Sequence, residues 1–106
     1  MSMEIRVTGR HGGLGGGTWY AGRVDGYHFE ALVFGEPSQY GIDGGQVSKL
    51  YLWTGPKKKG GQEAAVFERG WELEPNDEVR PVVEFLVREL SRLEREATPD
   101  ERTKVQ

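Results

Sequence analysis

The feature that most constrains this chain is the dipeptide Asp25-Gly26, which lies between two runs of alternating side chains, TWYAGRV and YHFEALVF. A two-residue loop with glycine in second place is typical of a tight β-hairpin, because both turn residues must adopt positive φ. The short turn also fixes the register, so that Val24 faces Tyr27. One face of the predicted hairpin is then almost entirely apolar and is assigned to the core: Thr18, Tyr20, Gly22, Val24, Tyr27, Phe29, Ala31 and Val33.

The opposite face of the same hairpin is polar near the turn and apolar at its far end, where Trp19, Leu32 and Phe34 project. A further strand is predicted for VSKLYLW (47–53), because strand residues alternate between the two faces of a sheet. Its core-facing residues are Ser48, Leu50 and Leu52, and its outward-facing residues are Val47, Lys49, Tyr51 and Trp53.

Two more strands are indicated by the segments EIRVT (4–8) and EAAVFER (63–69). The glycine-rich run 9–17 and the segment 54–62, which contains three consecutive lysines, are predicted to be loops. The chain therefore contains about five strands.

Apolar residues recur at three- and four-residue spacing through EVRPVVEFLVRELSRLEREA (78–97), which indicates an amphipathic helix. Asn76 or the residue after it can cap this helix, and Pro81 favours a main helix that begins near residue 80. We predict an α+β fold, in which a meander-like antiparallel sheet is covered on one face by this helix. Residues 1–97 form a single domain, and residues 98–106 are expected to be a disordered tail.

The segment EPSQYGIDGGQ (36–46) is predicted to be the crossing from the third strand to the fourth. Pro37 bars helical geometry before it, and Asp43-Gly44-Gly45 tolerates positive φ. A functional alternative is an anion-binding nest of backbone N–H groups. Its residues would be Ser38, Gly44, Gly45 and Ser48, with Lys49 nearby. No recognised phosphate-binding spacing accompanies them, so the structural interpretation is favoured.

A longer pattern runs from Trp19 to Leu50: W-Y-x-G-x-V-x-G-Y-x-F-x-A-x-V-F-x-E-x-S-x-Y-G-I-x-x-G-x-V-S-K-L. The residues E-R-G-W at 68–71 then precede the helix. This pattern resembles a family of small uncharacterised domains of bacteria and their phages, over about residues 18–95. The resemblance implies a shared fold. It implies no activity, because none is established for that family.

Composition argues against several classes of function. Because the chain has no cysteine, it cannot form disulfides, thiolate metal sites or a cysteine nucleophile. No apolar run approaches the roughly 20 residues of a membrane span, and the N-terminus lacks a signal-peptide pattern, so we expect a soluble cytoplasmic protein. His11, His28 and Glu30 do not make a closed metal site, and no nucleophile elbow is present. We therefore expect no metal, no cofactor and no catalytic activity.

One helix covers one face of a sheet, so the side chains on the other face define a candidate binding surface. Its residues are Trp19, Leu32, Phe34, Lys49, Tyr51 and Trp53. The first hypothesis is an interaction module that forms a homodimer or binds another protein there. The second is a binder of single-stranded nucleic acid or a small anion, which would add the lysines at 57–59. The net charge of −3 favours the first hypothesis.

Overall fold

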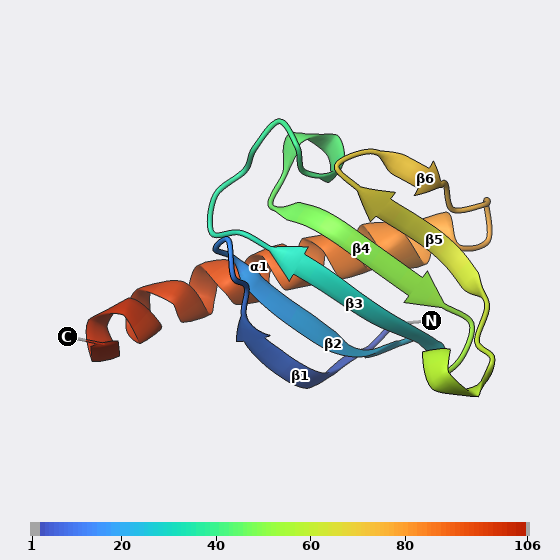
Figure 1. Cartoon of the computed structure of the whole chain (residues 1–106), viewed down its shortest axis with the longest axis horizontal. Helices are drawn as coiled ribbons and strands as arrows, with labels where there is room; N and C mark the ends of the chain where they lie inside the picture. Colours follow the sequence, from blue (N-terminus) through green and yellow to red (C-terminus); the bar gives the residue numbers. More distant parts are fainter. Residues whose placement is uncertain (1–2, 106) are drawn as a thin grey trace.

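The computed structural model describes the backbone of residues 3–105 and the side chains of residues 3–96. Within this part, the fold is α+β: six antiparallel strands follow one another in chain order, and one α-helix lies against one face of the sheet (Figure 1). The strands are β1 (Ile5–Gly12), β2 (Thr18–Val24), β3 (Tyr27–Val33), β4 (Val47–Trp53), β5 (Glu63–Glu68) and β6 (Trp71–Leu73). The helix is α1 (Arg80–Val105), and two short 3-10 turns are η1 (Ile42–Gly44) and η2 (Lys57–Lys59).

The hairpin at Asp25-Gly26 is confirmed with the predicted register. Asp25 and Gly26 adopt φ values of 47° and 83°, the left-handed conformation that this kind of turn requires. Val24 pairs with Tyr27, and the pairing continues without a bulge to the far end of both strands. The inward side chains of β2 and β3 are buried or half-buried, as expected of a core face.

The sheet has six strands rather than about five, and its first strand is longer than predicted. The glycine-rich run 9–17 was predicted to be a loop, but β1 continues into it as far as Gly12. A bulge at Thr8 shifts the register and allows β1 to remain paired with β2 over this length. The additional strand β6 pairs with β5, and the ring of Trp71 meets Phe67 edge-on at 5.1 Å between centroids. Three residues carry too short an alternation to be recognised as a strand from sequence.

A β-bulge breaks the alternation at the start of β4. The register shifts so that Val33 pairs with Val47 while Leu32 pairs with Lys49. Val47 is therefore turned into the core and fully buried, which corrects its predicted place on the outer face. Ser48, predicted to face the core, instead lines a hollow at the end of the sheet. A bulge adds one residue to one strand and leaves no mark in the alternation that precedes or follows it.

The helix begins as predicted. The side chain of Asn76 accepts a hydrogen bond from the N–H of Val79 at 2.9 Å, which satisfies one of the free N–H groups at a helix start. Pro81 is the second residue of α1, where its missing N–H removes no internal hydrogen bond.

The apolar stripe of α1 packs on the sheet through the buried residues Val82, Val83, Leu86 and Leu90, and Val79, which immediately precedes the helix, is buried beside them. The helix continues to Val105 instead of ending at Ala97. The expected disordered tail, 98–106, falls on residues whose side chains, with the whole of Gln106, lie outside the described part of the chain. The stripe covers one face of the sheet, so the candidate binding surface lies on the other.

Candidate functional site

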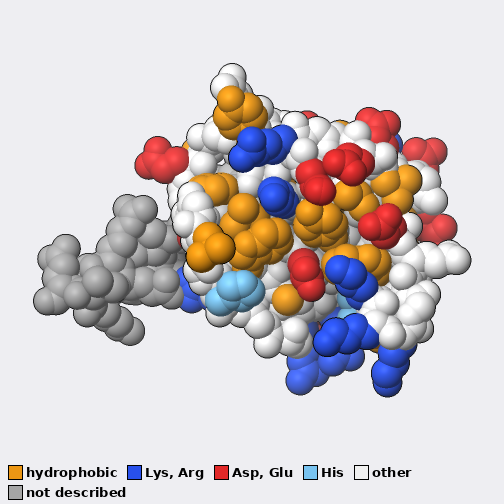
Figure 2. Space-filling model, in the orientation of Figure 1, with side chains coloured by type: hydrophobic (Ala, Val, Ile, Leu, Met, Phe, Trp, Pro, Cys, Tyr) orange, Lys and Arg blue, Asp and Glu red, His pale blue; other side chains and the backbone are white. Residues whose placement is uncertain are grey.

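The uncovered face of the sheet is a mixed surface rather than a continuous apolar patch. Figure 2 shows apolar side chains near its centre, with cationic and anionic side chains between and around them. Five of the six residues predicted for this face are half-buried: Trp19, Leu32, Phe34, Lys49 and Tyr51. The aromatic members of this set, Trp19, Phe34 and Tyr51, therefore keep part of their surface available to a partner.

The glycine turn 13–17 covers the apolar end of this face. The N–H of Gly13 donates to the carbonyl of Gly17 at 3.0 Å and closes the turn. Gly17 has a φ of +77°, and a Cβ there would lie 3.1 Å from Leu32 and from Phe34. Glycine is therefore required at this point, because the backbone packs directly over those two side chains.

Trp53 lies on the expected face but is not exposed, since only 5% of its surface is accessible. Lys57 of η2 lies over the ring, with its Nζ 5.3 Å from the ring centroid. Tyr51 stacks beside it, with centroids 6.0 Å apart and an angle of 11° between the ring planes. The expectation that Trp53 presents its ring to a partner is therefore wrong, because the lysine loop folds back over it.

Tyr51 is surrounded by Glu30, Glu68 and Glu72, which we call the acidic cluster. Burial, a hydrogen bond with Glu68 and the negative charges of all three carboxylates raise the pKa of Tyr51 to about 12. The surroundings of Tyr51 therefore disfavour additional negative charge. This part of the face repels anions and attracts cations.

Cationic side chains gather at another edge of the same face, along its lower side in Figure 2. Arg6 and Arg23 lie directly opposite each other on β1 and β2, and Lys57 lies over Trp53, two strands from Arg23 in the same row of the sheet. We call Arg6, Arg23 and Lys57 the basic cluster. No member of either cluster forms an ion pair with another described residue. Like charges facing each other across strands are unfavourable, and neither cluster is balanced by an ion pair among the described residues, although Lys49 lies in register with Glu68.

A hollow of about 580 Å³, which we call the end pocket, opens where β4 begins. Five residues that the sequence suggested for two separate sites meet in its walls: Leu32, Phe34, Ser38, Ser48 and Lys49. Further walls come from Tyr40, Arg69 and Glu94. The aromatic face and the loop 34–45 thus share one cavity. Trp19 lines a separate, smaller hollow of about 240 Å³.

The backbone N–H groups of the loop do not form the expected anion nest. The N–H of Gly41 donates to the carbonyl of Ser38 at 3.1 Å, and the N–H of Gly44 donates to Gly41 at 3.0 Å. The N–H of Gly45 donates to the carbonyl of Ile42 at 2.9 Å. These groups are occupied within the loop, so Gly44 and Gly45 offer no anion site, whereas Ser38 reaches the end pocket.

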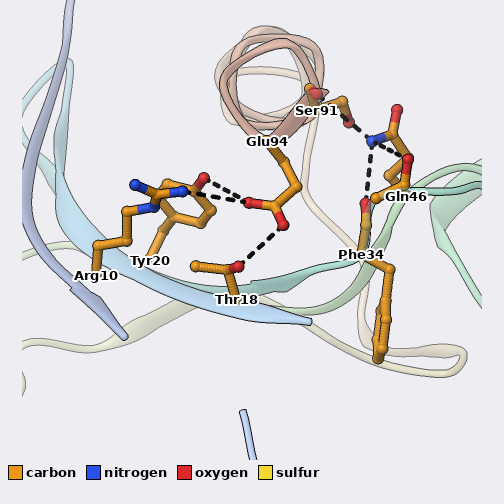
Figure 3. A network of polar contacts seen from close by, with 8 residues as sticks. Arg10, Thr18, Tyr20, Phe34, Gln46, Ser91 and Glu94 are labelled. Carbon is orange, nitrogen blue, oxygen red and sulfur yellow. Dashed lines mark hydrogen bonds and ion pairs between the residues drawn. The ribbon is translucent and has the colours of Figure 1, made fainter. Parts of the chain in front are cut away.

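Gln46 connects the wall of the end pocket to α1 through hydrogen bonds. Its side-chain amide donates to the carbonyl of Phe34 at 3.0 Å and to that of Ser91 at 3.5 Å (Figure 3). Its oxygen accepts a hydrogen bond from Arg95 at 2.7 Å. Because Gln46 is buried, this bridge holds Phe34 in place from the core side.

A buried carboxylate lies beside the end pocket. Glu94, with 5% of its surface exposed, accepts hydrogen bonds from the hydroxyls of Thr18 at 2.9 Å and Tyr20 at 2.8 Å (Figure 3). The guanidinium of Arg10 lies 4.0 Å from its Oε1. Burial, the hydrogen bond to Glu94 and its negative charge raise the pKa of Tyr20 to about 12, against a lowering by Arg10.

This network was not predicted from the sequence, because carboxylates on an amphipathic helix ordinarily face solvent. A signal was present, since Glu94 follows Leu90 by four residues and so lies on the apolar stripe. Thr18 and Tyr20 carry hydroxyls on the inward face of the hairpin, where a buried acceptor is needed.

Among the described residues, no group of His, Cys, Asp and Glu side chains is arranged to hold a metal ion. None of the described helices is both long and apolar enough to span a membrane.

Comparison with known proteins gives one match. A family model described as a domain of unknown function, DUF7678, matches residues 18–91. No curated protein and no solved structure matches the chain. The matched segment begins with β2 and ends within α1, so it contains both the uncovered face of β2 to β6 and every residue of the end pocket except Gly17 and Glu94.

Proposed function

The chain belongs to DUF7678, a family of domains of unknown function, and from this premise we propose that it is a non-catalytic interaction module that forms a homodimer through the uncovered face of its sheet. The observation that carries the proposal is the separation of the basic and acidic clusters on that face, neither of which forms an ion pair with another described residue.

The two clusters are complementary to each other under two-fold symmetry. A two-fold axis that lies in the face, perpendicular to the line joining the clusters, places the basic cluster of one copy on the acidic cluster of the other. The dimer then contains two contacts of this kind, and in each of them a basic cluster faces an acidic cluster. Such complementarity favours one mode of association and disfavours others, because any different register brings like charges together.

Half-buried aromatic side chains lie on the same face and would supply the apolar centre of the interface. Trp19 and Tyr51 project from β2 and β4 and keep part of their surface exposed. Tryptophan and tyrosine are the side chains that most often carry binding energy at protein interfaces. Trp53, being covered by Lys57, contributes support to Tyr51 rather than a direct contact.

Single-stranded nucleic acid is the alternative occupant of this face. Lys49 lies near one end of β4, and the lysines of η2 follow its other end. A nucleic-acid strand that contacted both sets of lysines would pass Tyr51, which is surrounded by the three carboxylates of the acidic cluster. Repulsion of phosphates there favours a protein partner.

The test is a charge reversal followed by light scattering, with circular dichroism to confirm folding. The wild-type chain should be a dimer, and Arg23→Glu or Glu72→Arg alone should give monomers by placing like charges together. The double variant Arg23→Glu with Glu72→Arg should restore the dimer. Lys58→Glu, an exposed change on η2 outside both clusters, is the control and should leave the dimer unchanged. If the wild-type chain is monomeric at high micromolar concentration, the homodimer proposal is refuted, and a different protein remains as the proposed partner.

A further inference from the structure

The end pocket has the size and walls of a small-molecule site. Its volume of about 580 Å³ lies within the roughly 300–1,000 Å³ that is usual for ligand pockets. Leu32, Phe34 and Pro37 provide apolar surface, and Tyr40, a residue that is 52% exposed, adds an aromatic ring. A flat or aliphatic group can therefore be buried against these walls.

Two cations reach the pocket from neighbouring strands. Lys49 projects from β4, and Arg69 follows β5, where its N–H donates to the carbonyl of Ser48 at 3.3 Å. Lys49 is in register with Glu68, yet neither cation forms an ion pair with a described residue. Two cations that form no ion pair with a described residue, beside apolar walls, favour a ligand that carries an anionic group.

The backbone of Arg69 is held in an unfavourable conformation. Its φ is 65°, in the left-handed region that a residue with a Cβ rarely adopts, and such positions often occur at functional sites. The guanidinium lies over the ring of Tyr40, 5.5 Å from the centroid. This cation–π contact holds the guanidinium at the pocket wall, where its N–H groups can donate hydrogen bonds to a carboxylate or phosphate.

The two carboxylates in the pocket walls do not cancel these cations. Glu94 is engaged by the hydroxyls of Thr18 and Tyr20 and lies beside Arg10. Glu36 is exposed to solvent, where its charge is screened by water.

We propose that the end pocket binds a small organic anion, with a carboxylate or phosphate head group between Lys49 and Arg69. The apolar body of the ligand packs against Leu32 and Phe34, and the hydroxyl of Ser48 is available to the head group. This inference does not depend on the homodimer, because neither Lys49 nor Arg69 belongs to the clusters that define the dimer.

The probes for the test are phenyl phosphate and benzoate, which combine an anionic head group with a ring. Inorganic phosphate and benzyl alcohol each supply only one of the two parts. Titrations followed by two-dimensional amide NMR report both affinity and location. Phenyl phosphate or benzoate should shift the signals of residues 32–40, 48, 49 and 69, and should bind about tenfold more tightly than either half alone. The absence of saturable shifts with both probes would overturn the proposal.

Variants then assign the head group. Arg69→Gln and Lys49→Gln should each weaken binding about tenfold, the loss expected for one charge-assisted hydrogen bond. Lys58→Gln removes an exposed lysine outside the pocket and should leave the affinity unchanged. An equal loss of affinity in this variant would show that binding depends only on the overall charge of the protein, and it would overturn the proposed site. Repeating the titration with Arg23→Glu separates the two proposals, because that variant should lose the dimer and keep the ligand.

Discussion

Removing the carboxylate of Glu94 should cost the domain a large share of its stability. Glu94→Ala leaves the hydroxyls of Thr18 and Tyr20 without their acceptor and Arg10 without its neighbouring carboxylate. A hydrogen bond to a charged group contributes about 1.5–3 kcal/mol, and two such bonds are lost here, whereas Arg10, with 32% of its side chain exposed, stays solvated. We expect the free energy of unfolding to fall by about 3–5 kcal/mol, from the roughly 5–15 kcal/mol typical of a domain.

The assay is equilibrium unfolding in urea, followed by tryptophan fluorescence and circular dichroism. Glu96→Ala is the matched control, because Glu96 lies two residues further along α1 and its side chain is 61% exposed in a surface pair with Arg92. That change should cost at most about 1 kcal/mol. Glu94→Gln retains one oxygen acceptor and should fall between the two.

A double-mutant cycle isolates the contact with Tyr20. Tyr20→Phe removes the hydroxyl that donates to Glu94 at 2.8 Å. The loss of unfolding free energy in the double variant should therefore be smaller than the sum of the two single losses, by about 1 kcal/mol or more. If Glu94→Ala costs no more than Glu96→Ala, the buried network does not stabilise the fold, and the described burial of Glu94 is refuted.

Three further changes test other parts of the molecule. Gly26→Val should lower the free energy of unfolding by about 1 kcal/mol or more, because a β-branched residue resists the φ of 83° there; an unchanged thermal midpoint would contradict the turn. Leu90→Ala should cost about 2–5 kcal/mol in the urea titration, because the side chain is fully buried. Stability should fall from pH 10 to pH 12, because the unfolded chain loses the Tyr20 proton near 10.0 and the folded chain keeps it to about 12. Tyr20→Phe should reduce this fall, and Tyr51, whose pKa is also about 12, should account for part of what remains.

The elements that depend on local rules were predictable from the sequence. The hairpin is determined by two turn residues and by alternation on both sides of them, and its register followed directly. The start of the helix is determined by the side chain of Asn76 and by the place of Pro81. The bulge before Lys49 was not predictable, because either register leaves the alternation of neighbouring residues intact.

The candidate site was predicted in part for the same physical reason. The face of a strand residue follows from its parity, so the outward positions of Trp19, Tyr51 and Trp53 were found from sequence. Exposure depends on segments distant along the chain, and nothing near Trp53 in the sequence shows that Lys57 folds back over its ring. Likewise, the position of Arg69 beside Ser48 requires the pairing of β4 with β5.

Three departures from regular strand geometry meet at the end pocket, and this is where we expect function to depend on structure. The bulge between Leu32 and Val33 turns Ser48 out of the core and into the pocket wall. The positive φ of Arg69 places a guanidinium on that wall, and the positive φ of Gly17 allows a turn to cover its apolar side. A meander does not need the bulge, whereas the positive φ values of Gly17 and Arg69 occur in the tight connections β1–β2 and β5–β6, and the one at Arg69 costs on the order of 1 kcal/mol or more. Because Arg69→Gly would relieve that strain and remove the guanidinium together, it should raise stability and weaken binding of phenyl phosphate about tenfold, as Arg69→Gln does, whereas a loss of both stability and binding would show that Arg69 only supports the turn.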